Sequence, residues 1–517
     1  MKRTCIAVLG LMVVPSGEAL AQRSAVEVAR AYREAHGAEI LRDFRELLAI
    51  PNVARDSVGI NANAAYIRDR LAALGVESRL LRLPGVPPIV YGELLVPGAT
   101  RTLAVYVHYD GQPVDSSRWS NAPWTPVLYD GALEAGAGRL PFPEPGEPID
   151  PEWRIYARSA GDDKAPIGAL LPVLAAFAEA GITPTSNIKF FFEGEEEAGS
   201  VRLGRYLEDH RALLDDIDIW LFFDGPVHQS RRPLLTFGVR GVTGLEVTVY
   251  GSNRPLHSGH YGNWAPVPGQ MLAELLASMK SRDGRVVVEG FYDTVEPLGE
   301  LERAALEALP DYDGQLKEEL GLARTEGNGA SLAEQLLLPS LTVRGLASAN
   351  VGALVRNIIP ATATAALGIR LVKGNDPEHM KDLVEAHIRR QGYHIVREDP
   401  DQATRLQYPR IAKVTRSGGY PAARTSMDLP IVQQVVDAVR EAAGDELVLV
   451  PALGGSLPLY LFTDLMAKPA LIVPIANHDD NQHAADENLR IANLWYGIEL
   501  YAALFTMAPG QSPVQDR

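Results

Sequence analysis

The chain is almost free of cysteine. Its 517 residues contain only one, Cys5, close to the amino terminus. Cys5 lies in a short apolar run that we expect to be removed from the mature protein, which would then have no disulfide and no catalytic thiol. Any metal that the protein binds must therefore be held by histidine, aspartate and glutamate side chains.

A long hydrophobic run is also lacking. The apolar run of residues 5–14 follows Lys2 and Arg3 and is far shorter than the ~20 residues that a membrane-spanning helix needs. Small residues follow it, so residues 1–21 have the charged start, apolar centre and small-residue exit of a secretory signal peptide. We therefore expect an exported protein, periplasmic or secreted, with no stable membrane span.

Positive charge is scarce. The chain has 49 lysine and arginine residues against 65 aspartate and glutamate residues, which gives a net charge of -16. This acidic balance, without a basic stripe, argues against nucleic acids and anionic membranes as partners. The length allows a large core and two or more domains.

Strand-like and helix-like segments alternate in the first half of the chain. Runs of β-branched and aromatic residues at 102–109, 187–193 and 217–224 are typical of buried strands, and residues 166–180 between them are typical of a helix. This alternation predicts an α/β fold with a mostly parallel sheet, in which ligands bind at the carboxyl ends of the strands. Three residues whose side chains can bind a metal or transfer a proton lie at or just after such ends: His108, Glu196 and Asp224.

The pattern changes after Arg240. Two strand-like segments, 245–250 and 363–372, and two helical segments, 268–280 and 377–390, suit a small α+β insert, which the polar run 397–420 is expected to close. The α/β pattern returns from residue 427 onward. The predicted organisation is a signal peptide (1–21), a catalytic domain in two parts (22–240 and 419–517) and an inserted domain (241–418).

Two acidic motifs allow both a structural and a functional interpretation. A histidine that ends a strand, with Asp110 two residues further on, can be a metal ligand and the carboxylate that orients its ring, or a structural histidine. Asp162 and Asp163 precede a predicted helix, so they can cap its amino terminus, or one of them can bridge two cations. The sequence alone leaves these alternatives open.

Three consecutive acids follow a buried aromatic strand at Glu195-Glu196-Glu197. In a desolvated cleft they would repel one another, and a dication would relieve that repulsion while a neighbouring acid serves as a base. A solvated charge run is the alternative. Asp224 is either a ligand or a turn residue, and His478 and His483 are both candidate ligands from the last part of the chain.

These motifs together resemble one family, the dinuclear-zinc exopeptidases, which include carnosine-type dipeptidases, glutamate carboxypeptidase, succinyl-diaminopimelate desuccinylase and aminoacylases. The resemblance covers nearly the whole mature chain. Five segments occur in the family's order: His108-Tyr109-Asp110, Arg158 to Lys164, Glu196-Glu197, Asp224, and His483 with Asp486-Glu487. The insert is similar too, at His257-Ser258-Gly259 and at Gly368-Ile369-Arg370, and so is the glycine-serine loop Gly454-Gly455-Ser456 in the second part of the catalytic domain.

The resemblance implies two zinc ions per chain, with Co²⁺ or Mn²⁺ as possible substitutes. Asp162 would bridge both ions, His108 and Asp224 would complete one, and Glu197 and His483 the other. Asp110 would orient His108, and Glu196 would be the general base. The groups implied for the substrate carboxylate are Arg370, Asn357, Gly455 and Ser456.

The resemblance also implies a dimer. His257 would donate to the oxyanion in the active site of the partner subunit, so the insert would be a lid and dimerisation domain of a homodimer. The bond between Asp162 and Asp163 is expected to be cis. Ala165 and Asp486 depart from the residues common in the family without removing a ligand.

The implied activity is hydrolysis of an amide or peptide bond next to a free carboxylate, of carboxypeptidase or dipeptidase type. An aminoacylase-like enzyme acting on N-acyl amino acids is the alternative, and nothing in the sequence separates the two. A metal-retaining protein without catalysis is a third hypothesis. Glu196 argues against this hypothesis, because a protein without catalysis needs no base outside the set of metal ligands.

Overall fold

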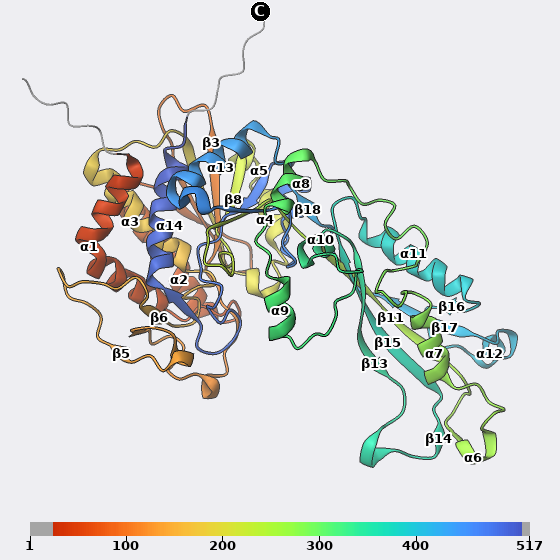
Figure 1. Cartoon of the computed structure of the whole chain (residues 1–517). Coiled ribbons are helices and arrows are strands. Elements are labelled where there is room, and N and C mark those ends of the chain that lie inside the picture. The colour runs from red at the N-terminus through yellow and green to blue at the C-terminus, as the bar shows by residue number, and fades with distance from the viewer. Residues whose placement is uncertain (1–23, 509–517) are drawn as a thin grey trace, which may run out of the picture.

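The structure is a computed structural model that describes residues 24–508. The predicted signal peptide lies outside the described residues. The chain forms a larger part built on an eight-stranded sheet and an elongated smaller part built on a five-stranded sheet (Figure 1). No helix of the described chain is long and apolar enough to cross a membrane.

The central sheet of the larger part is parallel from β7 through β3 and β8 to β20. Antiparallel pairs occur between β1 and β2, β2 and β7, and β20 and β9. The predicted α/β fold with a mostly parallel sheet is thus confirmed. In spatial order the strands are β1 (Glu77–Leu81), β2 (Ile89–Leu94), β7 (Asn187–Glu193), β3 (Thr102–His108), β8 (Ile219–Phe222), β20 (Ala470–Ile472), β9 (Leu234–Thr236) and β19 (Val448–Val450).

Helices cover both faces of this sheet. One hydrophobic core lies beneath α1 (Ala25–Leu48), α2 (Ser57–Ala73), α3 (Ala165–Ala180), α13 (Pro430–Ala443) and α14 (Ile491–Phe505). A second core lies beneath α4 (Leu203–Asp209), α5 (Arg211–Leu214) and η6 (Leu461–Leu465). Helix α3 follows the Asp162-Asp163 motif directly and packs against α1 and α14, so the loop before it is held on a rigid element.

A four-stranded sheet stands beside the central one. It joins β21 (Asn488–Arg490), β6 (Arg154–Tyr156), β4 (Val127–Tyr129) and β5 (Arg139–Leu140). Pairing of β6 with β21 brings the segment before Asp162 next to the segment after His483. Two ligand candidates more than 300 residues apart in sequence are thereby brought close together.

The smaller part carries a five-stranded sheet, ordered β13 (Ser340–Ala347), β15 (Thr362–Leu371), β11 (Gly241–Tyr250), β17 (Ile411–Arg416) and β16 (His394–Val396). Alternate residues of β11 and β15 form a core with α7 (Pro268–Ala277) and α11 (Pro377–Arg390), so both helices cover one face of the sheet. The opposite face of the sheet is not part of this core. We call the smaller part the lid, and this opposite face of its sheet the open face of the lid.

The expectation of a two-stranded insert closed by a polar run is wrong. Strands β13, β16 and β17 belong to the sheet, and the supposed polar run 397–420 contains both β17 and α12 (Gln402–Gln407). These strands were missed because β13 is exposed along most of its length, β16 has only three residues, and Lys413 and Arg416 interrupt the apolar pattern of β17. Three short helices lie between α7 and β13 along the chain: α8 (Glu300–Glu307), α9 (Asp313–Glu319) and α10 (Leu332–Leu336).

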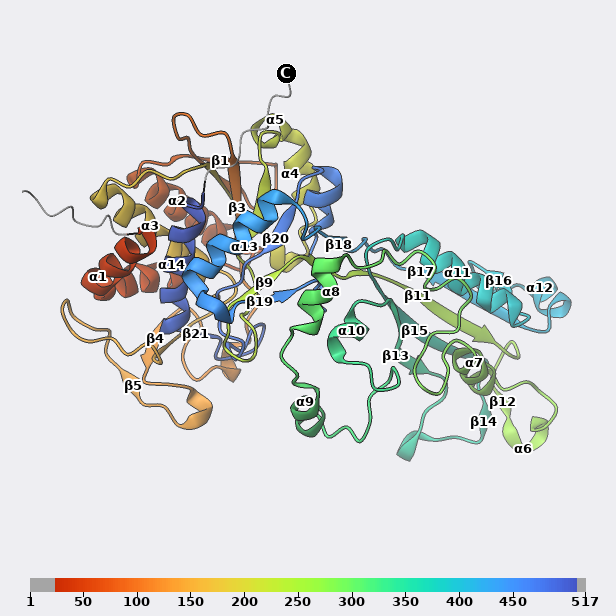
Figure 2. The ribbon, with the colours of Figure 1, turned by 45° about the horizontal axis from the view of Figure 1, so that its top comes forward.

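At the junction of the two parts, β10 (Gly238–Val239) pairs with β18 (Ala423–Arg424), and α8 packs against β19 of the larger part. The exact domain limits stay a prediction. The end of the lid far from the larger part carries β12 (Leu256–His257), α6 (Ser258–Tyr261) and β14 (Ile358–Ile359) (Figure 2). We call this end the lid tip.

Candidate metal centre

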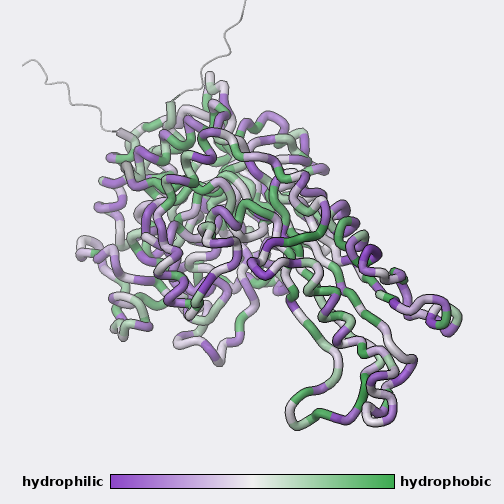
Figure 3. Tube along the Cα trace, turned by 45° about the vertical axis from the view of Figure 1, so that its right-hand side comes forward, coloured by the Kyte–Doolittle hydropathy of each residue, from purple (hydrophilic) through white to green (hydrophobic). Residues whose placement is uncertain are grey.

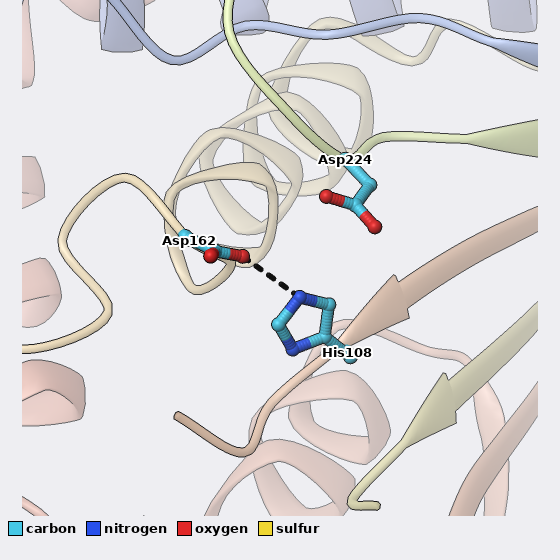
Figure 4. Close-up of side chains that lie close together, drawn as sticks. All are labelled: His108, Asp162 and Asp224. Atoms are coloured by element: carbon cyan, nitrogen blue, oxygen red, sulfur yellow. Dashed lines mark hydrogen bonds and ion pairs between the residues drawn. The ribbon is translucent and has the colours of Figure 1, made fainter. Parts of the chain in front are cut away.

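Three of the predicted ligands converge at the carboxyl edge of the central sheet. His108 is the last residue of β3, Asp224 follows β8, and Asp162 lies in the loop before α3 (Figure 4). Each offers a ligand atom within 4.8 Å of the others. The Nε2 atom of His108 lies 2.9 Å from Oδ1 of Asp162.

A second group of three shares Asp162 with the first. Nε2 of His483 lies 3.0 Å from Oδ2 of Asp162 and 3.2 Å from Oε2 of Glu197. The two oxygens of Asp162 therefore face different histidines. This is the arrangement that a carboxylate bridging two cations requires.

Asp110 connects the two groups. Its Oδ1 lies 3.5 Å from Nδ1 of His108, on the side of the ring that faces away from Asp162. The same carboxylate accepts hydrogen bonds of 3.1 Å from the backbone N–H groups of both Glu196 and Glu197. One buried side chain thus orients a ligand histidine and also the short helix η3 (Glu196–Ala198) that carries the predicted base and another ligand.

The loop that presents Asp162 is held by Glu487. This buried carboxylate accepts hydrogen bonds from Arg158 and from the backbone N–H groups of Ser159, Gly161 and Asp162. The peptide bond between Asp162 and Asp163 is cis, as expected from the resemblance.

Two open alternatives are decided by the geometry. No side chain caps the amino terminus of α3, whose N-cap is Lys164, and Asp163 instead accepts a hydrogen bond from the backbone N–H of His108. Of the two rival histidines, only His483 lies in a candidate ligand group within the described part of the chain, whereas His478 faces Asp479 at 3.9 Å.

Burial strongly perturbs the acids of this centre. It raises the pKa of Asp224 to about 6 and the pKa of Glu196 well above its usual range. Burial acts in the same direction on Asp162, but hydrogen bonds from His108 and His483 hold its pKa below the ordinary value. Hydrogen bonds to Asp162 and Glu197 raise the pKa of His483 to about 10.

These residues fit a pair of divalent cations. The donors are imidazole nitrogens and carboxylate oxygens, which suit zinc and related metals. Several acids in one buried cleft are costly unless cations or protons neutralise them. Asp162, Asp224 and His108 are each buried, so cations would offset a real electrostatic penalty here.

The predicted substrate groups occupy two separate places. Arg370 donates from its guanidinium to the hydroxyl of Ser456, and Tyr420 donates to the carbonyl of Ser456 at 3.1 Å. Ser456 and Tyr420 line a cavity of about 360 Å³ together with Glu196 and Glu197. The neighbouring carbonyl of Gly455 accepts a hydrogen bond from the backbone of Arg240 at the junction with the lid.

His257 and Asn357 instead lie together at the lid tip. The carbonyl of Asn357 accepts a hydrogen bond from Ser258, and His257 pairs with Ile358. The lid tip lies at the opposite end of the molecule from β3 and β8, the strands that His108 ends and Asp224 follows (Figure 1). One chain therefore does not bring these two residues to its own site in this conformation.

Several polar residues of the centre were not singled out from the sequence. Gln482 donates to Asp162 at 2.8 Å and Gln112 donates to Glu197 at 2.7 Å. Asn52 donates to the carbonyl of Tyr109 and to the hydroxyl of Ser159. An isolated amide side chain in a loop forms no recognisable sequence motif. The position of Gln482 next to His483 is the one feature of the sequence that indicates a place near the centre.

The fold and the site together define a two-part metal-dependent hydrolase with a catalytic sheet and an inserted lid. Residues 104–507 match the model of peptidase family M20/M25/M40. The chain belongs to this family.

Relatives and solved structures are similar over most of the chain. The Cys-Gly metallodipeptidase DUG1 of Candida albicans is 26% identical, covering 89% of this chain and 93% of the relative. The human Beta-Ala-His dipeptidase is 26% identical, covering 92% and 91%. The structure of the M20 family metallo-carboxypeptidase Sso-CP2 from Sulfolobus solfataricus has a TM-score of 0.71 at 27% identity, covering 91% of this chain and 99% of that one. The dipeptidase Dug1p from Saccharomyces cerevisiae, at 21% identity, has a TM-score of 0.68, covers 93% and 98%, and shows the shared fold.

Replacing Asp110 by asparagine tests its connecting role. An amide has one oxygen, so it cannot accept from both backbone N–H groups of η3 while also orienting His108. We expect metal affinity to fall by about 10–100-fold, as for other groups that orient metal ligands. Competition with a chromophoric chelator measures this affinity.

Asp115→Asn is the matched control, because Asp115 is a solvent-accessible carboxylate that caps a separate short helix. An Asp110→Asn protein that binds metal as tightly as this control would contradict the connecting role.

Proposed function

We propose that this protein is an exported dizinc hydrolase that cleaves the amide bond next to the free carboxylate of a dipeptide or short peptide. One observation carries the proposal. One cavity is lined by Glu196 and Glu197, which adjoin the shared-carboxylate centre, and also by Ser456, which is bonded to Arg370. A short substrate can therefore reach the metal centre and a carboxylate-binding arginine together.

The side chains have separable roles in the reaction. Bound cations would polarise the scissile carbonyl and acidify the attacking water. Glu196 accepts the proton of that water and returns it to the leaving amine, because its carboxylate is no member of either candidate ligand group within residues 24–508. Arg370 and Ser456 hold the substrate carboxylate, to which an arginine can donate two parallel hydrogen bonds.

The proposal of zinc rests on the donor set. Each group of three combines histidine nitrogen with carboxylate oxygen, without a thiolate, and leaves room for water or substrate as a further ligand. Co²⁺ and Mn²⁺ accept the same donors, so they are expected substitutes.

The names of the relatives favour small peptides as substrates. The similar proteins include metallodipeptidases and a metallo-carboxypeptidase. An aminoacylase-like activity gains no comparable support, and the non-catalytic alternative does not explain why Glu196 lines the cavity without belonging to a ligand group.

Hydrolysis assays on metal-loaded protein test the proposed function. We expect about two divalent ions per chain by elemental analysis, as a two-metal mechanism requires. Dipeptides should be hydrolysed faster than N-acyl amino acids with the same carboxyl-terminal residue. Activity should be lost on chelation and return with Zn²⁺. Faster hydrolysis of the N-acyl series would replace the dipeptidase proposal by the aminoacylase one.

Two neighbouring glutamates should respond differently to substitution. Glu196→Gln removes the base but no proposed ligand, so we expect the metal content to remain and turnover to fall by about 10²–10⁴-fold. Glu197→Gln should instead lower the metal content. Elemental analysis and kcat, measured on the same preparations, separate the effects. Metal loss in Glu196→Gln but not in Glu197→Gln would show that the roles are reversed.

The proposal includes a homodimer formed through the lid. Apolar side chains are exposed along β13 and the segment that follows it, among them Leu346 and Val351, the latter 86% exposed. Figure 3 shows hydrophobic segments continuing to the far end of the lid. Exposed apolar patches of this kind mark protein interfaces, and a dimer would explain why His257 lies away from its own metal centre.

Mixing two inactive variants tests whether His257 acts in the partner's site. His257→Ala should lower kcat by about 10²–10³-fold if it is one oxyanion donor, with metal content unchanged. Combined with Glu196→Gln chains, it should recover part of the activity, because one hybrid site pairs an intact base with an intact histidine. Persistent inactivity despite demonstrated subunit exchange would contradict action in trans.

The proposed export rests on residues 1–21 alone. Their charged start, apolar run and small-residue exit are typical of a cleaved signal. We expect protein recovered from outside the cytoplasm to begin at Gln22, as measured by amino-terminal sequencing. An intact Met1 on the active protein would contradict the proposal.

A further inference from the structure

A second arginine lies beside Arg370 on the open face of the lid. Strand β13 pairs regularly with β15 up to Val343 and again from Gly345, which leaves Arg344 as an extra residue in a β-bulge. Bulges re-aim side chains and are frequent next to active sites.

Two glycines make room for the Arg344 side chain. A Cβ atom at Gly368 would lie 2.8 Å from Cδ and from Nε of Arg344, and one at Gly244 would lie 3.2 Å from its Nη2. Gly368 and Gly244 are directly paired on β15 and β11. The arginine therefore extends flat across two strands, and its guanidinium reaches the middle of the sheet.

This position adjoins the predicted carboxylate site. Arg370 is two residues beyond Gly368 on the same strand, so both positions point to the same face and are separated by about 7 Å along the strand. Arg370 pairs with Val242, which in turn bridges to Tyr420 of the cavity. Arg344 is thus one row further from the metal centre than Arg370.

Neither guanidinium is neutralised by a carboxylate. Within the described chain no acidic oxygen lies within 4.0 Å of Arg344 or Arg370, although acids outnumber bases overall. Glu246, two residues along β11 from Gly244, faces the same side without forming an ion pair. Both arginines are solvent-exposed in the single chain.

We propose that Arg344 binds a second carboxylate, that of the side chain of the substrate's carboxyl-terminal residue, so that the enzyme prefers peptides ending in aspartate or glutamate. The inference rests on the proposed function. With the α-carboxylate at Arg370, a side chain extending away from the metal centre along the open face meets Arg344. Arginine suits this role because its planar donors match a carboxylate.

Matched peptides that differ only in charge test this specificity. We expect metal-loaded protein to have a higher kcat/KM for Ala-Glu than for the isosteric Ala-Gln. Arg344→Ala should lower kcat/KM for Ala-Glu by about 10–100-fold, the usual cost of losing a hydrogen bond to a charged group. The loss should appear chiefly in KM, and Ala-Gln should change by less than about twofold, as expected at an exposed site.

Further variants separate recognition from folding. Arg344→Lys should retain part of the preference, since the charge remains without the planar fork. Arg344→Glu should favour Ala-Lys over Ala-Glu. Arg282→Ala, which removes an exposed arginine from a turn elsewhere in the lid, should leave all of these ratios unchanged.

The proposal is overturned if wild-type protein hydrolyses Ala-Glu and Ala-Gln equally, or if Arg344→Ala slows both to the same extent. Calorimetric binding of free glutamate and glutamine gives a readout independent of turnover. If the wild type cleaves no dipeptide, the proposed function fails. Tighter binding of glutamate that Arg344→Ala abolishes would still support the second carboxylate site, and equal binding would overturn it.

Discussion

The crowding of acids at one buried edge of the central sheet is the constraint on which the rest of the site depends. Asp162, Asp224 and Glu197 approach two histidines within a few ångströms, and burial makes their mutual repulsion costly. The chain holds them there with further buried carboxylates, of which Asp110 and Glu487 each accept several backbone hydrogen bonds. The same packing that presents the ligands therefore creates an electrostatic demand for cations.

The junction between the two parts links this centre to the lid. The backbone of Arg240 bonds to Gly455, and Arg370 of the lid sheet bonds to Ser456 of the catalytic part. A substrate carboxylate bound at this place would contact both parts together. Under the proposed function, substrate binding and the position of the lid would be connected through these few hydrogen bonds, as in a lid that closes over its substrate.

Much of the catalytic part could be predicted from the sequence because its strands are short, continuous apolar runs that end in polar residues. The aromatic run before Glu193 and the one before Asp224 indicate both the strands and the edge where they end. The strands of the lid were harder to predict. Its edge strand β13 is exposed and apolar, and Lys413 and Arg416 interrupt the apolar pattern of β17. Both segments are strands because they pair with neighbouring strands, and not because of their local sequence pattern.

The residue types alone define the donors that this protein offers: candidate metal ligands without thiolates, their order along the chain, and a further acid beside them. Only the tertiary structure distinguishes between residues whose local sequence fits a metal ligand equally well. It directed Asp162 toward two histidines instead of a helix cap, and brought His483 rather than His478 to the centre. The physical reason is that each choice depends on strand pairing between segments hundreds of residues apart, such as β6 with β21, which no local pattern encodes.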